Sequence, residues 1–175
     1  SQYDGNECAR VLDGESSVPS NAAGVAYGLG FKIPVYSINS TSGARAVTLT
    51  HKQGGSIIQC NASNNSGGDI TITLPAIDAV GKQGVQYTVT LTSANASNRL
   101  VKILTTGADG NDKFVGFGFN GSTSYSDTDG GDTVTIGNSA ILGTTVRVTN
   151  LSSGAGNNAE VWLVEAFGTA AVTID

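Results

Sequence analysis

The chain has 175 residues, enough for one domain with a sizeable core, and 39% of them are apolar. Only 13% are charged, against roughly 25% in average proteins, and the formal net charge is −5. The nine basic residues are scattered singly, so no nucleic-acid-binding patch is predicted, and no run approaches the roughly 18 apolar residues of a membrane span. The start of the chain also lacks the basic-then-apolar order of a signal peptide, so we expect a soluble protein.

Residues 1–30 differ from the rest of the chain because they show no clean helical or strand period. We predict an extended N-terminal arm, with a loosely held terminus as the alternative. The arm carries apolar and aromatic side chains that a purely solvated tail would have little reason to hold. We therefore predict that it contacts another protein surface through Tyr3, Arg10, Leu12, Tyr27 and Leu29.

Residues 31–175 are predicted to form a single all-β domain, because short runs with a period of two recur between turn residues. In residues 85–92 the odd positions are apolar and the even ones polar, as expected for a half-buried strand. The other predicted strands are 31–38, 46–50, 55–60, 70–74, 99–104, 112–117, 133–136, 145–149 and 159–167. About ten short strands at this spacing indicate an antiparallel β-sandwich, a jelly roll or a tulip-like barrel.

Two segments depart from plain alternation. Residues 161–167 are apolar on both faces except for Glu165, which indicates a central strand or one covered by a neighbouring subunit, with Trp162 in the core. Residues 116–121 alternate glycine with Phe117 and Phe119. Their rings either plug one end of the core or are displayed on the outside.

No set of residues singles out an enzyme, and we predict no catalytic residues and no cofactor. Residues 116–121 match the G-x-G-x-x-G pattern of dinucleotide sites, but no helix is predicted to follow, so the match is interpreted as accidental. His51 is the single histidine and has no recognisable serine partner for a catalytic triad. Cys8 and Cys60 either pair in a disulfide or remain free, with Cys60 as a small buried apolar residue.

Acidic residues gather at 127–132, where Asp127, Asp129 and Asp132 stand close to a glycine-permitted bend. Oxygen ligands converge on Ca²⁺ in this manner, so the three carboxylates are weak candidates for a calcium site. The alternative is a solvated turn, since Asp side chains stabilise turns by themselves. No metal site is predicted with any greater specificity.

Several motifs together resemble the β-modules of tailed-bacteriophage capsid decoration (cement) proteins and head fibres. They comprise a strand ending in Leu-Pro-Ala, a Gly-x-x-Tyr-Thr strand, a turn rich in Ala, Asp and Gly, and a late Trp strand. In this chain the Leu-Pro-Ala strand is 69–76, the Gly-x-x-Tyr-Thr strand is 84–89, and the turn rich in Ala, Asp and Gly is 106–116. The segment 130–135 follows, and Trp162 lies in the late strand. The similarity covers residues 69–167 and does not extend to the first 30.

The resemblance implies a structural virion protein that binds the outside of the major capsid protein lattice and stabilises the shell. It further implies a homotrimer located on the capsid surface of particles assembled in the host cytoplasm, with no nucleic-acid or membrane partner. The alternative is a carbohydrate-binding or adhesin module of a fibre or cell surface, in which Tyr125, Phe117 and Phe119 would stack on sugars. A secreted hydrolase ranks last, for want of a convergent catalytic set.

Overall fold

The computed structural model confirms the predicted all-β class, since its described part holds twelve strands and one short 3-10 helix. The structure describes residues 33–64, 66–77, 83–96, 98–106, 112–120, 123–151, 161–168 and 172–175, with the backbone alone at 120 and 123–130. Pro34–Asp175 form one compact unit. The predicted arm and its five interface residues lie outside the described part of the chain, so they stay a prediction.

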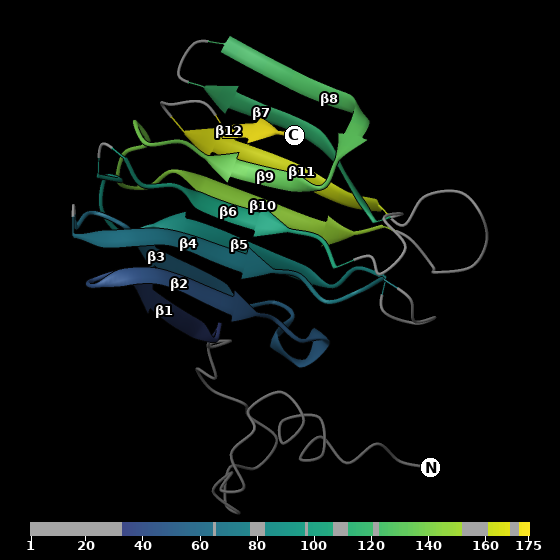
Figure 1. The fold of residues 1–175 in the computed structure, drawn as a ribbon. Helices are drawn as coiled ribbons and strands as arrows, with labels where there is room; N and C mark the ends of the chain where they lie inside the picture. Colours follow the sequence, from purple (N-terminus) through teal and green to yellow (C-terminus); the bar gives the residue numbers. More distant parts are fainter. Residues whose placement is uncertain are drawn as a thin grey trace, which may run out of the picture. The chain divides into compact units, whose positions relative to one another are not determined.

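The strands form two sheets, which lie face to face as two layers in Figure 1. Seven strands form sheet A, and in spatial order they are Val35–Asn39 (β1), Ile57–Asn61 (β3), Gln86–Leu91 (β5), Thr145–Asn150 (β10), Val161–Gly168 (β11), Lys113–Asn120 (β7) and Thr123–Gly131 (β8). Five strands form sheet B, in the order Val172–Ile174 (β12), Thr133–Ile136 (β9), Val101–Leu104 (β6), Gly67–Thr73 (β4) and Gly43–Thr48 (β2). The 3-10 helix η1, His51–Gln53, follows β2.

The first six strands alternate between the two sheets. β1, β3 and β5 pair in parallel within sheet A, and β2, β4 and β6 pair in parallel within sheet B. The chain therefore winds as three coils of a flattened β-solenoid, and each coil gives one strand to each sheet. The second half of the chain joins the third coil through the antiparallel pairs β5–β10 and β6–β9.

Side chains at every second strand position fill the space between the sheets. In sheet B, Ile70, Val101 and Ile136 occupy one register row across three neighbouring strands and are fully buried. Strands pack about 4.8 Å apart, so each row is a continuous column of apolar contacts. Burying one such side chain contributes about 1.5–3 kcal/mol.

Sheet A buries the largest side chains of the core. Tyr87 and Trp162 are both fully buried, with ring centroids 6.0 Å apart, and the Tyr87 hydroxyl donates a hydrogen bond to the Thr50 carbonyl oxygen at 2.8 Å. The prediction that Trp162 belongs to the core is confirmed. Cys60 is also fully buried and is a free thiol.

The expected antiparallel arrangement is corrected by the structure, because both sheets are mixed. Parallel pairs join the three coils to one another and join β7 to β11. Each of the ten predicted segments contains or overlaps a strand, but β8 and β12 were not predicted. Residues 123–131 are rich in Ser, Asp and Gly because β8 is a strand at the edge of sheet A, where an apolar pattern is not required.

Candidate protein-binding face

The outer surface of sheet A is apolar over β7 and β11. Phe117 and Phe119 of β7 and Phe167 of β11 have 48%, 53% and 50% of their surface exposed. Parallel pairing aligns Phe119 with Phe167 and Val115 with Leu163, so all five side chains lie on one side of the sheet. We call these five residues the aromatic face.

Glycines on the inner side of β7 explain why its phenylalanines point outward. Gly116 and Gly118 alternate with Phe117 and Phe119, and Gly118 is buried. A Cβ atom at Gly116 would overlap the backbone of Val164 on the neighbouring strand. β7 therefore packs its glycine side inward, and the alternative that the rings plug the core is wrong.

Two ion pairs lie within and beside the aromatic face. Glu165 is aligned with Phe117 on one side and with Arg147 on the other, and the Arg147 Nη1 and Glu165 Oε2 atoms are 3.6 Å apart. At the start of β7, Lys113 Nζ donates a hydrogen bond to Asp132 Oδ1 at 2.7 Å. Exposed pairs of this kind contribute about 0–1 kcal/mol to stability. Glu165 stands between Leu163 and Phe167 on β11, so one charge lies within the aromatic face, and the Lys113–Asp132 pair lies at its end.

The outer surface of sheet B has a different character. Its aligned outward positions are mostly threonines, with Lys102 and Asp69 forming an ion pair of 3.5 Å among them. The threonines are Thr71, Thr73, Thr133, Thr135 and Thr173. This surface is suited to contact with water. On the aromatic face, about half of each of the three phenylalanine rings is accessible, which leaves roughly 300 Å² of ring surface exposed.

An exposed apolar area of about 300 Å² is within the range of the largest patch on a typical monomer, and such patches often contact another molecule. Interfaces are enriched in aromatic side chains at their centre and carry polar groups at the rim. The five apolar residues, with charged side chains among and beside them, therefore match a protein-binding surface.

The three candidate calcium ligands are only partly described, so this calcium site stays a prediction. Asp132 is exposed and its carboxylate is engaged by Lys113. The side chains of Asp127 and Asp129 lie outside the described residues, although β8 includes both positions. Within the described ranges, no group of three or more His, Cys, Asp or Glu residues is arranged to hold a metal ion.

The remaining residues singled out from the sequence have structural positions. His51 begins η1 and is half-buried. Burial raises the pKa of the Cys60 thiol to about 12, so this thiol is protonated and unreactive near neutral pH. Cys8 and Tyr125 fall outside the residues whose side chains are described.

Sequence reasoning did not identify Phe167 as part of a site. The only signal was that residues 161–167 are apolar on both faces, which indicated either a central strand or one covered by a neighbour. The structure confirms the interior position of β11 in sheet A and shows Phe167 exposed on its outer side, while coverage by a neighbouring subunit stays a prediction.

No protein-family model matches the chain, and neither a curated protein nor a solved structure shows significant similarity to it. Among the described residues, no helix is long and apolar enough to cross a membrane.

Proposed function

We propose that the chain is a non-enzymatic structural protein of a bacteriophage virion: a capsid decoration (cement) protein that binds the outside of the major capsid lattice and stabilises the shell. The observation that carries this proposal is the aromatic face, in which Phe117, Phe119 and Phe167 stand about half exposed on a rigid pair of central strands. A surface built on paired strands holds its side chains in place before binding, which lowers the ordering cost of association.

The physical role is the burial of apolar surface at many equivalent positions. Covering roughly 300 Å² of exposed ring surface yields at most about 7 kcal/mol for one copy, at 25 cal/mol per Å². A closed oligomer that engages several capsid subunits at once multiplies this modest contribution through avidity. A homotrimer with the aromatic face of each subunit turned toward the shell fits this role.

The experiment compares purified particles that carry wild-type protein with particles exposed to a variant. In the double substitution Phe117→Ser and Phe119→Ser, we expect a large loss of bound protein, measured by quantitative mass spectrometry of the particles after sedimentation. Val35→Ser is the matched control, because Val35 is 52% exposed but lies on β1, at the opposite edge of sheet A from β7 and β8. Equal retention of all three proteins, or absence of the wild-type chain from particles, would refute the proposal.

A second candidate function is carbohydrate binding by a fibre or adhesin module. The observation that favours it is again the exposure of Phe117 and Phe119, because aromatic rings provide flat surfaces for the apolar faces of sugars. A glycan array run with and without a chelator tests this candidate. Specific retention lost in the Phe117→Ser and Phe119→Ser variant would favour sugar binding over shell binding.

A further inference from the structure

The end of the molecule at β1 and β2 is the end of the solenoid. Among the described residues, β1 pairs only with β3, and β2 pairs only with β4. In β2 every residue is exposed except Val47, which is half-buried. Within the part of the chain that the structure describes, both sheets therefore end here on a strand whose outer edge pairs with no other strand (Figure 1).

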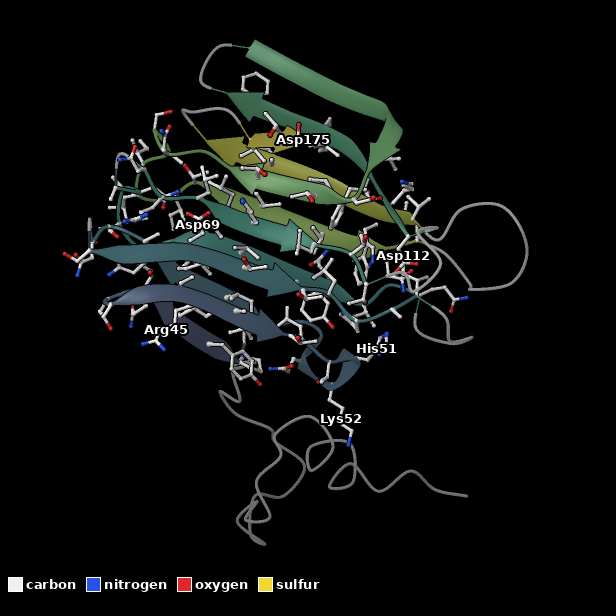
Figure 2. The ribbon with its side chains drawn as sticks, in the orientation of Figure 1. Arg45, His51, Lys52, Asp69, Asp112 and Asp175 are labelled. Atoms are coloured by element: carbon white, nitrogen blue, oxygen red, sulfur yellow. The ribbon has the colours of Figure 1, made fainter. Side chains whose placement is uncertain are left out.

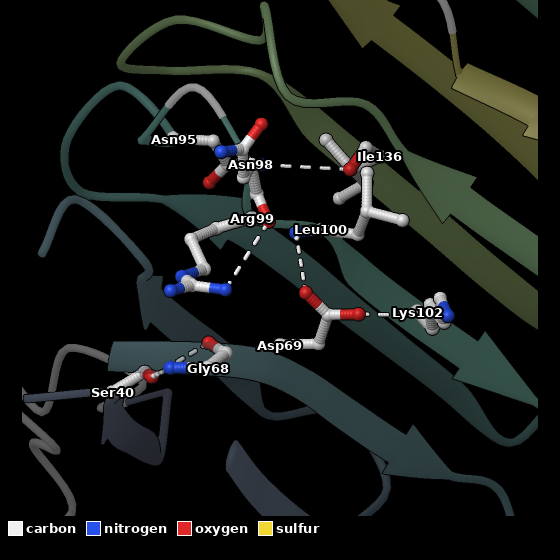
Figure 3. A network of polar contacts seen from close by, with 9 residues as sticks. All are labelled: Ser40, Gly68, Asp69, Asn95, Asn98, Arg99, Leu100, Lys102 and Ile136. Atoms are coloured by element: carbon white, nitrogen blue, oxygen red, sulfur yellow. Dashed lines mark hydrogen bonds and ion pairs between the residues drawn. The ribbon is translucent and has the colours of Figure 1, made fainter. Parts of the chain in front are cut away.

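The edge is held rigidly against the next coil. Ser40, between β1 and β2, accepts a hydrogen bond from the Gly68 amide at 2.7 Å, and its hydroxyl lies 2.6 Å from the Gly68 carbonyl oxygen (Figure 3). The Asn64 side-chain amide donates to the Thr41 carbonyl oxygen at 2.8 Å. A Cβ atom at Gly68 would overlap the backbone of Ala44, so glycine at this position permits β2 to lie close to β4. The β2–β4 register shifts between Gly43 and Arg45, so the regular part of the edge with which a further strand can pair begins at Arg45.

One residue breaks the apolar pattern at this edge. Arg45 is aligned with Ile70, and the same register row continues through Val101, Ile136 and Val172, all of which are buried and apolar. Arg45 therefore occupies an inward-facing position at the end of an apolar column. Figure 2 places it at the β2 edge, with Lys52 of η1 extending from the same end.

The charge at this position has no acidic partner in the described part of the chain. The ion pairs formed there are Lys102–Asp69, Lys113–Asp132 and Arg147–Glu165, and none includes Arg45. The next inward position, Val47, is apolar and packs against the core. A strand added to β2 would consequently meet a cation at one inward position and an apolar side chain two residues further along.

We propose that this edge binds an extended segment of a partner protein by strand addition to β2, with an acidic side chain of that segment facing Arg45 and an apolar one facing Val47. Main-chain hydrogen bonds supply affinity in this mode, and alternate side chains supply specificity. A second copy of the chain is a poorer occupant, because symmetric pairing of β2 with itself brings two Arg45 side chains near each other. The surface is distinct from the aromatic face, so it does not depend on the proposed function.

The test uses fluorescein-labelled eight-residue peptides that alternate Thr with Val and carry Asp, Asn or Lys at one inward position. Binding to the full chain is measured by fluorescence anisotropy up to millimolar concentration. The Asp peptide is expected to bind about tenfold more tightly than the Lys peptide, a difference of about 1.4 kcal/mol. In the Arg45→Glu variant the order of the two peptides should invert. Lys102→Glu, an equal charge change on the outer face of sheet B, should keep the wild-type order.

Two sets of results would overturn the inference. In the first, no peptide binds, or the preference for Asp is unchanged by Arg45→Glu. In the second, analytical ultracentrifugation shows a self-association that the Asp peptide disrupts, which would assign the edge to a second copy of the chain. Thermal unfolding of both variants near the wild-type temperature confirms that they are folded when the peptides are compared.

Discussion

The buried thiol and phenol of the core make the free energy of unfolding sensitive to alkaline pH. Burial raises the pKa of Cys60 from 9.0 to about 12 and that of Tyr87 from 10.0 to about 12. Both groups are uncharged when protonated, and the folded state keeps their protons to higher pH than the unfolded state does. The stability they contribute is therefore complete below about pH 9 and is lost as the pH rises toward 12.

The size of the loss follows from these values. At pH 11 the unfolded chain gains about 3 kcal/mol from ionising Cys60 and about 1 kcal/mol from ionising Tyr87, relative to the folded state. The total of about 4 kcal/mol is a large part of the 5–15 kcal/mol typical of a domain. With a urea dependence of about 2 kcal/mol per M, the unfolding midpoint should fall by about 2 M between pH 8 and pH 11.

The assay is urea unfolding followed by the fluorescence of Trp162, the single tryptophan, which is buried beside Tyr87. Cys60→Ala provides the internal control, because it removes the larger contribution and leaves that of Tyr87. Its midpoint should fall by less than 1 M over the same pH range. A wild-type midpoint that stays constant to pH 11, or an identical slope in Cys60→Ala, would contradict this account of the core.

Three further predictions concern single residues and assembly. Gly116→Ala should lower the free energy of unfolding by about 3 kcal/mol or more, because its Cβ would overlap the backbone of Val164. Gly55→Ala should lower it by only about 1–2 kcal/mol, because Gly55 has a φ of 79° but open space around it. Chemical denaturation of both variants measures the difference. Tyr87→Phe removes the hydrogen-bond donor to the Thr50 carbonyl oxygen and should lower the free energy of unfolding by about 1 kcal/mol, measured in the same way. An unchanged unfolding midpoint would show that this hydrogen bond does not stabilise the fold. Light scattering of the purified chain should give the mass of a trimer, and a monomer at all concentrations would remove the trimer from the proposal.

The sequence predicted the strands well because one face of each sheet meets the core and the other meets water. The alternation at residues 85–92 corresponds to β5, and the segment 133–136 is β9 without change of boundary. β12 was not predicted because it is only three residues long, and β8 was not predicted because its Ser, Asp and Gly residues are typical of turns.

Strand direction could not be predicted from the same pattern. A half-buried strand alternates in the same way whether its neighbour is parallel or antiparallel, so the three stacked coils were not recognised. Parallel strands usually read as continuous apolar runs because both of their faces are covered, and β4 and β6 lack that feature. No fixed repeat in the sequence marks the coils.

Only part of the candidate site could be predicted from the sequence. The Gly-Phe alternation at 116–119 indicated rings on one side of a strand, but it did not tell which side faced the core. Phe167 lies far from Phe119 in the sequence and becomes its neighbour only through the parallel pairing of β11 with β7. Arg45 gave no signal at all, since its inward position depends on the register with Ile70.

Hydroxyl-radical footprinting of the free chain and of the chain on purified particles tests the central claim most directly. Oxidation of Phe117, Phe119 and Phe167 should fall severalfold on particles, because a partner surface covers their exposed rings. Val35, which is similarly exposed but lies on β1 at the opposite edge of sheet A from β7 and β8, should be oxidised at the same rate in both samples. Equal oxidation of the three phenylalanines in the free and particle-bound states would contradict the proposal that the aromatic face is the surface of attachment.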